Sequence, residues 1–157
     1  MQDTPTAQPK MDTLGHGYYF EDLKEGMEES FSKVISEQDV DQFAILSGDR
    51  NPVHLSDEFA AGTIFKKRIA HGFLTGSLIS TVLGTKLPGP GCIYLGQDLK
   101  FMAPVYLGDE VTATVTIQGL DPDKRRVVLN CVCSVDGKAV LTGVAVVMVD
   151  SREKKKR

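Results

Sequence analysis

The chain contains no tryptophan, only three histidines and only three cysteines in 157 residues. With a formal net charge of −3, it also lacks the basic, aromatic-interleaved stripe that is typical of nucleic-acid-binding proteins. It has no signal peptide and no apolar run long enough to span a bilayer. We therefore expect a cytoplasmic protein that binds neither nucleic acid nor a membrane.

The few cysteines exclude a disulfide framework. Cys131 and Cys133 are two residues apart on a predicted strand, where they share a face without the geometry that a bridge favours. No histidine lies near them in the sequence, and Cys92 has no obvious base beside it. We interpret the pair as packing residues and predict no metal site.

The length is typical of one domain with loose ends. Residues 1–17 are rich in polar residues, Pro and Gly, which predicts a disordered extension or a segment added to the natural chain. Residues 18–150 form the predicted folded domain. Residues 151–157 are a charged tail that we expect to be solvated, with membrane or nucleic-acid contact as the lesser alternative.

Hydrophobic periodicity predicts helices in the first half of the chain. Residues 31–35 alternate like a short strand, and Ser36 with Asp39 is typical of a capping box. The apolar stripe of the helix that follows consists of Val40, Phe43, Ala44 and Leu46. Residues 56–61 predict a short helix. Residues 71–87 are apolar on most sides and end at a Pro-Gly-Pro-Gly breaker, which is typical of a buried helix.

The second half predicts a sheet. Runs rich in Val, Ile, Thr and aromatic residues cover residues 93–103, 110–119, 126–135 and 138–149. Together with the buried helix they indicate an α+β fold, a single hotdog domain in which a curved antiparallel sheet wraps around a long central helix. Such a sheet has an open edge, which a symmetric dimer commonly covers.

The most informative segment is residues 49–54, Asp-Arg-Asn-Pro-Val-His. Gly48 suits the left-handed position that ends a helix, and Pro52 pushes the residue before it toward extended backbone, so we predict a rigid bend here. A carboxylate and an imidazole that converge from such a bend can move protons to and from a small molecule. In the alternative interpretation, Asp49 is only a turn residue and His54 is a half-buried imidazole.

Addition of water to an enoyl thioester is one reaction that this pair can serve. It builds negative charge on the thioester oxygen, and amide groups at the start of a helix are well placed to receive that charge. Gly72, at the start of the predicted buried helix, is the candidate donor. His71 beside it is either a capping or packing residue or a proton carrier, and Ser80 is expected to bond back to a carbonyl one turn earlier.

Three blocks of the sequence resemble the MaoC-like R-specific enoyl-coenzyme A hydratases: residues 46–54 (Leu-Ser-Gly-Asp-Arg-Asn-Pro-Val-His), 59–61 (Phe-Ala-Ala) and 69–72 (Ile-Ala-His-Gly). The likeness continues through residues 94–97, 101–105 and 108–109, and covers residues 18–149 overall. It implies a hotdog homodimer that reversibly hydrates trans-2-enoyl-coenzyme A to the (R)-3-hydroxyacyl thioester, with neither a metal nor another cofactor.

The resemblance also implies roles for single residues. Asp49 and His54 correspond to the catalytic dyad, and Asn51 holds its geometry. Gly72 supplies the oxyanion-binding amide, and Ser80 supports the dyad from the central helix. Hotdog thioesterases and bacterial acyl-carrier-protein dehydratases commonly carry a carboxylate on that helix, whereas residues 71–87 contain neither Asp nor Glu.

Two alternatives stay open at this point. The first keeps the dyad but dehydrates hydroxyacyl groups on acyl carrier protein, or acts on a branched or functionalised acyl-coenzyme A. The second is a non-catalytic hotdog subunit that binds thioesters. The sequence leaves open the acyl-chain length, the pathway, any oligomer beyond the dimer, and which member of the dyad activates water.

Substrate contacts are predicted less sharply. Residues that either bind the coenzyme A phosphates or are ordinary solvated charges are Lys66, Lys67, Arg68 and Lys100, with Lys86 a weaker candidate. Residues that are candidates for the acyl pocket are Phe73, Leu83 and those of the predicted strand 93–102, and His71 is a further candidate for substrate contact.

Overall fold

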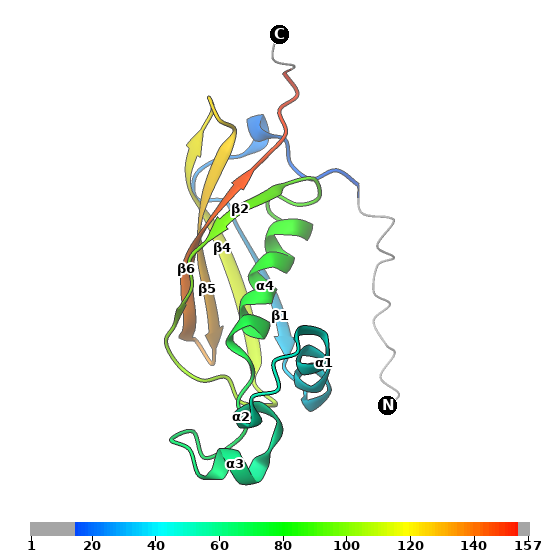
Figure 1. The fold of residues 1–157 in the computed structure, drawn as a ribbon. Coiled ribbons are helices and arrows are strands. Elements are labelled where there is room, and N and C mark those ends of the chain that lie inside the picture. Colours follow the sequence, from blue (N-terminus) through cyan, green and yellow to red (C-terminus); the bar gives the residue numbers. More distant parts are fainter. Residues whose placement is uncertain (1–14, 154–157) are drawn as a thin grey trace, which may run out of the picture.

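The computed structural model describes residues 15–153, whose strands form one antiparallel sheet beside a central helix (Figure 1). A 3-10 turn, η2 (Phe20–Asp22), precedes the first strand. The helices are α1 (Glu37–Ser47), α2 (Pro52–Leu55), α3 (Asp57–Ala61) and α4 (Gly72–Thr85). The strands are β1 (Glu28–Val34), β2 (Ile93–Gln97), β3 (Lys100–Phe101), β4 (Glu110–Asp121), β5 (Arg126–Val135) and β6 (Lys138–Met148).

The sheet runs in the order β1-β4-β5-β6-β2, and β3 pairs with β6. Residues of β4 and β5 alternate between buried and more exposed positions, as expected for a sheet with one face on the core. On the outer face, the hydroxyl groups of Ser30 and Thr114 lie 2.9 Å apart, and those of Ser32 and Thr112 lie 2.7 Å apart. These cross-strand pairs help to extend β1 back to Glu28, earlier than residue 31, where the strand was predicted to begin.

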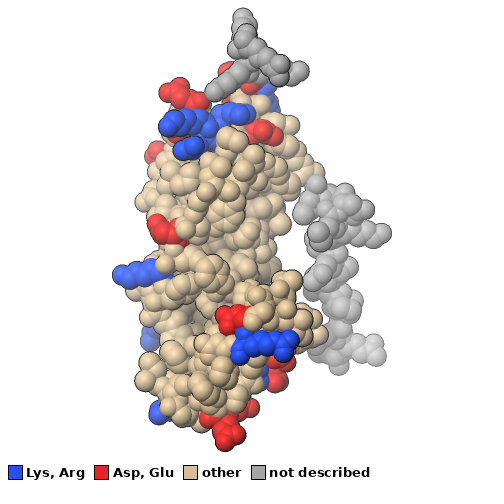
Figure 2. All heavy atoms as spheres, viewed as in Figure 1, with Lys and Arg blue, Asp and Glu red and all other residues tan. Residues whose placement is uncertain are grey.

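Helix α4 lies along one face of the sheet and contacts β1, β4 and β5 (Figure 1). Its buried side consists of Thr75, Leu78, Ile79, Val82 and Leu83. The opposite side is open, and few charged side chains cover the face over α4 and β2 (Figure 2). The prediction of an α+β hotdog domain with a buried central helix is therefore confirmed, with one side of that helix left exposed.

Two local predictions were wrong. Residues 93–103 are not one strand, because the main chain leaves the ladder at Asp98, whose carboxylate accepts a hydrogen bond from the Val144 amide at 2.9 Å. Gly143 lies opposite, where the Asp98 carbonyl leaves no space for a Cβ atom. Leu46 does not share the buried stripe of α1, since it is 86% exposed while Val40 and Ala44 are buried.

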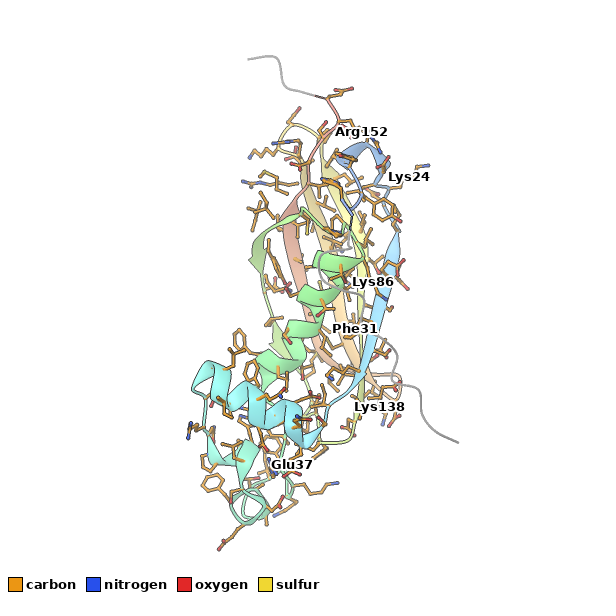
Figure 3. All side chains as sticks on the ribbon, turned by 90° about the vertical axis from the view of Figure 1, so that its right-hand side faces the viewer. Lys24, Phe31, Glu37, Lys86, Lys138 and Arg152 are labelled. Atoms are coloured by element: carbon orange, nitrogen blue, oxygen red, sulfur yellow. The ribbon has the colours of Figure 1, made fainter. Side chains whose placement is uncertain are left out.

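The amino-terminal end of the described chain packs on the loop after α4 and also binds the carboxyl-terminal end. The Gly17 amide donates to the Pro90 carbonyl at 2.9 Å, and the His16 ring stacks on Tyr19 with 4.2 Å between centroids. Residues 16 and 17 of the predicted extension thus pack on the folded domain, while residues 1–14 lie outside the described part. The guanidinium of Arg152 binds both carboxylate oxygens of Asp22, at 2.7 and 2.9 Å, so the charged tail is held at its start (Figure 3).

No helix within residues 15–153 combines the length and the apolar character that crossing a bilayer would require.

Candidate active site

The bend after α1 is built by short-range hydrogen bonds. The capping box of Ser36 and Asp39 starts α1, and Gly48, with φ of 79°, ends it in the left-handed conformation. The Asn51 side chain accepts a hydrogen bond from the Val53 amide at 3.2 Å and so caps α2, with Pro52 in its first turn. The predicted bend is confirmed, and it carries one helical turn that contains His54.

His54 is held in one orientation and is only 8% exposed. Its Nδ1 donates to the Ile69 carbonyl at 2.7 Å, and because a carbonyl can only accept, Nε2 is left with a free lone pair. Burial is the largest influence on the pKa of His54 and lowers it below the ordinary value of 6.5, although the bond to Ile69 opposes the shift. The result is an uncharged imidazole at neutral pH with Nε2 available as a base.

Asp49 reaches the same point from the exposed side of the bend. Its Oδ1 accepts a hydrogen bond from the Asn51 amide at 3.2 Å, which links the carboxylate to the capping residue of α2. Potential ligand atoms of Asp49, His54 and His71 all lie within 4.8 Å of one another. Since each hydrogen bond of a water molecule spans about 2.8 Å, one water can bridge the carboxylate and the imidazole.

A cavity of about 450 Å³ opens beside His54. Gly72 lines it as well, so the imidazole and the start of α4 face the same space. The amide groups in the first turn of a helix have no carbonyl partner within the helix and carry a partial positive charge. The remaining wall is mostly apolar and includes Phe65, Phe73, Phe101, Met102, Val140 and Leu141. This combination suits an apolar chain that ends in a polar, oxygen-bearing group.

Phe101 packs closely on Gly72 where α4 begins. A Cβ atom at this position would lie 2.5 Å from Cε1 and 2.8 Å from Cδ1 of Phe101. The ring therefore packs directly on the glycine, next to the free amide groups. It also lies near Phe73, with 6.2 Å between the ring centroids.

The predicted substrate contacts divide into two groups. Phe73 lines the cavity as predicted, together with Phe101 and Met102 of the 93–102 segment. Leu83 does not line the cavity, because it is 1% exposed and packs in the core between α4 and the sheet. Ser80 is exposed two turns beyond Gly72 and lines a separate hollow of about 640 Å³ between α4 and the β2–β3 segment.

The basic residues predicted to bind coenzyme A also differ in their surroundings. Arg68 is neither solvated nor free, because its Nε donates to the His54 carbonyl at 2.7 Å and its guanidinium pairs with Glu37 and Asp41. Lys66 and Lys67 are exposed, and the Lys67 ammonium lies 4.8 Å from the centre of the Tyr106 ring. Lys100 is exposed beside the cavity residue Phe101.

Lys86 lies at the far end of α4 from Gly72 and is labelled in Figure 3. Its Nζ donates to the Ser30 carbonyl at 2.5 Å. This contact attaches the end of the helix to β1, so Lys86 does not face the candidate site.

The cluster of Asp49, His54 and His71 is also the group of described residues best suited to hold a metal ion. The hydrogen bonds from Nδ1 of His54 and Nε2 of His71 to main-chain carbonyls leave the other nitrogen of each ring open, so it is the spacing of the ligand atoms that fits a metal poorly. Ligand atoms on one tetrahedral zinc ion would lie about 3.4 Å apart, whereas these atoms spread over distances of up to 4.8 Å. The arrangement suits proton transfer through water better than metal binding.

Several cavity residues were not predicted. Thr75, Val105 and Val140 line the cavity although they lie on α4, in a loop and on β6. Of these three, only Thr75 has a position in the sequence that suggests a place at the site, because it lies one helical turn after His71.

An acid–base pair on a bend, beside the open start of a helix that a curved antiparallel sheet covers, defines a hotdog protein equipped for proton transfer. The family described as "MaoC like domain" matches residues 20–136, and the chain belongs to this family.

Relatives agree with this assignment. The chain is 56% identical over 135 residues to an (R)-specific enoyl-CoA hydratase of Rhodospirillum rubrum, covering 86% of this chain and 94% of that protein. It is 53% identical over 135 residues to a 3-hydroxybutyryl-CoA dehydratase of Methylorubrum extorquens, covering 86% of each. The unliganded structure of R-hydratase PhaJ1 from Pseudomonas aeruginosa superposes with a TM-score of 0.82 at 41% identity, covering 90% of this chain and 94% of that one.

Proposed function

We propose that this protein is an R-specific enoyl-CoA hydratase, a hydro-lyase that reversibly adds water to trans-2-enoyl-CoA and forms (R)-3-hydroxyacyl-CoA. One observation carries the proposal: a ring nitrogen of His54 and the carboxylate of Asp49 lie within 4.8 Å of each other, a span that one water molecule can bridge, and His54 lines a cavity that the start of α4 also lines. The printed activities of the relatives at 56% and 53% identity support it.

In the proposed reaction, His54 carries the proton. Nε2 removes one hydrogen from the bridging water as its oxygen bonds to C3 of the enoyl group. The imidazolium then returns that hydrogen to C2 on the same face, so that H and OH are added syn. The Asp49 carboxylate accepts a hydrogen bond from the other O–H group of the water, which orients the nucleophile, and its negative charge stabilises the transient imidazolium. General acid–base catalysis of this kind contributes about 10²–10⁴-fold.

The start of α4 stabilises the charge that develops during addition. As the water oxygen bonds to C3, electrons move onto the thioester oxygen. The Gly72 amide, at the positive end of the helix, receives this charge. Asn51 contributes indirectly. Its main-chain amide donates to the Asp49 carboxylate, and its side chain caps the helix that carries His54.

We further propose that two copies of the chain pair along β2. This strand is an edge of the sheet, and its apolar side chains Ile93, Tyr94 and Leu95 are 49%, 41% and 45% exposed. The 640 Å³ hollow that includes Ser80 lies beside it, under a face with few charges (Figure 2). A partner strand would cover both features. Light scattering that shows a monomer at assay concentrations would contradict the pairing.

Replacement of each dyad residue tests the proposed function. We expect Asp49→Asn and His54→Ala each to reduce the rate of crotonyl-CoA hydration by about 10²–10⁴-fold, with unchanged oligomeric state and circular dichroism. Asp57→Asn is the matched control, because it removes an exposed carboxylate that starts α3 and touches none of the proposed machinery. Wild-type turnover in either dyad variant would refute the mechanism.

The carrier of the acyl group is tested on the wild-type enzyme. We expect faster turnover of enoyl-CoA than of the same acyl group on acyl carrier protein, and only the (R)-3-hydroxy product on a chiral column. Faster turnover on the carrier protein would favour the acyl-carrier-protein dehydratase alternative. Absence of hydration across several acyl-chain lengths would favour a non-catalytic subunit.

A further inference from the structure

His71 occupies the N-cap position of α4 without capping it. Its side chain makes no cap hydrogen bond, although capping was one of its two predicted roles. The ring is only 2% exposed and is not among the residues that line the cavity. Its side chain is therefore neither in contact with the cavity nor used by its own helix, and its purpose must lie in the contacts that bury it.

Those contacts are with both members of the proposed dyad. Nε2 of His71 donates to the main-chain carbonyl of Asp49 at 3.0 Å. The ring also lies against His54, with 3.9 Å between centroids and 31° between planes. Phe43 of α1 covers another side, 4.8 Å away. The His71 side chain thus links the main chain of Asp49 to the ring of His54.

The remaining ring nitrogen indicates that this position needs a histidine and not merely a ring of similar size. Nδ1 of His71 is buried and has no hydrogen-bond partner among the described residues. Because Nε2 must carry a hydrogen to donate to the Asp49 carbonyl, Nδ1 is left as an unpaired buried polar atom. A residue that served only to fill space would avoid this penalty, since an apolar ring would pack equally well.

His71 is also part of a short segment that organises the whole site. The Ile69 carbonyl binds His54 Nδ1 at 2.7 Å, His71 contacts both dyad residues, and Gly72 starts α4. The Ala70 amide donates to the Val105 carbonyl at 2.7 Å, which fixes the segment to a neighbouring loop. Residues 69–72 therefore set the position of the imidazole, the carboxylate backbone and the helix start at once.

We propose that His71 is a positioning residue for the hydration reaction: through its hydrogen bond to the Asp49 carbonyl and its ring contact with His54, it holds the dyad at a fixed distance from the start of α4. This inference rests on the proposed function. In this role His71 acts through Asp49 and His54.

A consequence for pH dependence follows from the surroundings of His54. The charged or titratable groups around it are His71 from the start of α4, Asp49 from the bend, and Arg68, whose partners Glu37 and Asp41 are on α1. Burial and the nearness of His71 both lower the pKa of His54, while Asp49 raises it. Loss of the His71 ring removes one lowering influence and weakens the other, so the acid limb of kcat/KM shifts to higher pH.

Three substitutions separate the contacts. His71→Phe keeps a ring against His54 but cannot donate to the Asp49 carbonyl. His71→Gln keeps an amide donor but loses the ring, and His71→Ala loses both. We expect His71→Ala to lower kcat for crotonyl-CoA by about 10–100-fold with KM changed less than about threefold, because misplacement by about 1 Å costs this much. The Phe and Gln variants should each recover part of kcat, and the acid limb should move upward in the Ala and Gln variants.

Val82→Ala, a fully buried core truncation on the same helix, is the control for simple destabilisation. It should lower the melting temperature while kcat per folded enzyme and the acid limb stay unchanged. The inference is overturned if His71→Ala keeps wild-type kcat and pH profile, if KM rises while kcat is kept, or if Val82→Ala moves the limb equally. A wild-type enzyme that hydrates no enoyl-CoA would instead refute the proposed function.

Discussion

Replacement of Gly72 with alanine adds one methyl group at the point where α4 meets the cavity. The added Cβ would lie 2.5 Å from Cε1 of Phe101, whereas ordinary contacts begin at 3.4 Å, so the ring must retreat by about 0.9 Å. Phe101 is 53% exposed, and its ring can move toward solvent. We therefore expect little loss of stability, but a fall in kcat/KM of about 10–100-fold, because the wall beside the helix start shifts by about 1 Å.

A double-mutant cycle with Phe101→Ala tests this reasoning. Without the ring, the three closest contacts of the added methyl group are gone, so Gly72→Ala should cost less than about threefold in the Phe101→Ala background. The difference between the two backgrounds corresponds to a coupling of about 1 kcal/mol or more. Initial rates with crotonyl-CoA provide the four values, and thermal melts verify that all four proteins are folded.

Gly84→Ala is the matched control, since it changes another glycine of α4 whose Cβ would meet no atom within 4 Å. It should leave kcat/KM unchanged. Equal losses from Gly72→Ala in both backgrounds would show that the ring is not the reason for the glycine. Full activity of the single variant would show that the geometry at the start of α4 is not critical.

Three further predictions follow. Because burial lowers the pKa of His54 below 6.5, its basic form persists into more acidic solution than that of a free imidazole, so the midpoint of the acid limb of kcat/KM should lie below pH 6.5; a midpoint above that value would contradict this. Arg68→Met should lower the free energy of unfolding by about 1.5–3 kcal/mol in urea titrations and reduce kcat, because a charged hydrogen bond to the His54 carbonyl is lost. Arg68→Lys should restore neither the stability nor kcat. Lys66→Gln combined with Lys67→Gln should raise KM for crotonyl-CoA without changing kcat; an unchanged KM would remove both residues from coenzyme A binding.

Much of the site was predictable because its parts are local. The capping box of Ser36 and Asp39 needs only three residues of separation, and it is present. The glycine and proline on either side of Asp49 dictate the bend through their own backbone limits. The family resemblance rests on the same short blocks, and the family and the hotdog fold are confirmed.

The errors concern contacts between distant segments. Arg68 was predicted as a surface cation, but α1 brings Glu37 and Asp41 to it from about thirty positions earlier in the chain. Leu83 was predicted in the pocket because it is apolar and on α4, yet the rotation of that helix directs it into the core. The cytoplasmic location and the absence of a cofactor stay predictions.

The sequence by itself predicted most elements of this protein and its candidate acid–base pair, because caps, bends and periodicity act over a few residues and need no knowledge of the fold. Only the tertiary structure decided which atoms of that pair are free. The free lone pair of His54, its lowered pKa and the ring of His71 against it all depend on Ile69 and His71, which reach the bend from the segment before α4. Hydrogen bonding and desolvation are set by neighbours in space, and these neighbours exist only once the sheet has placed α4 beside the bend.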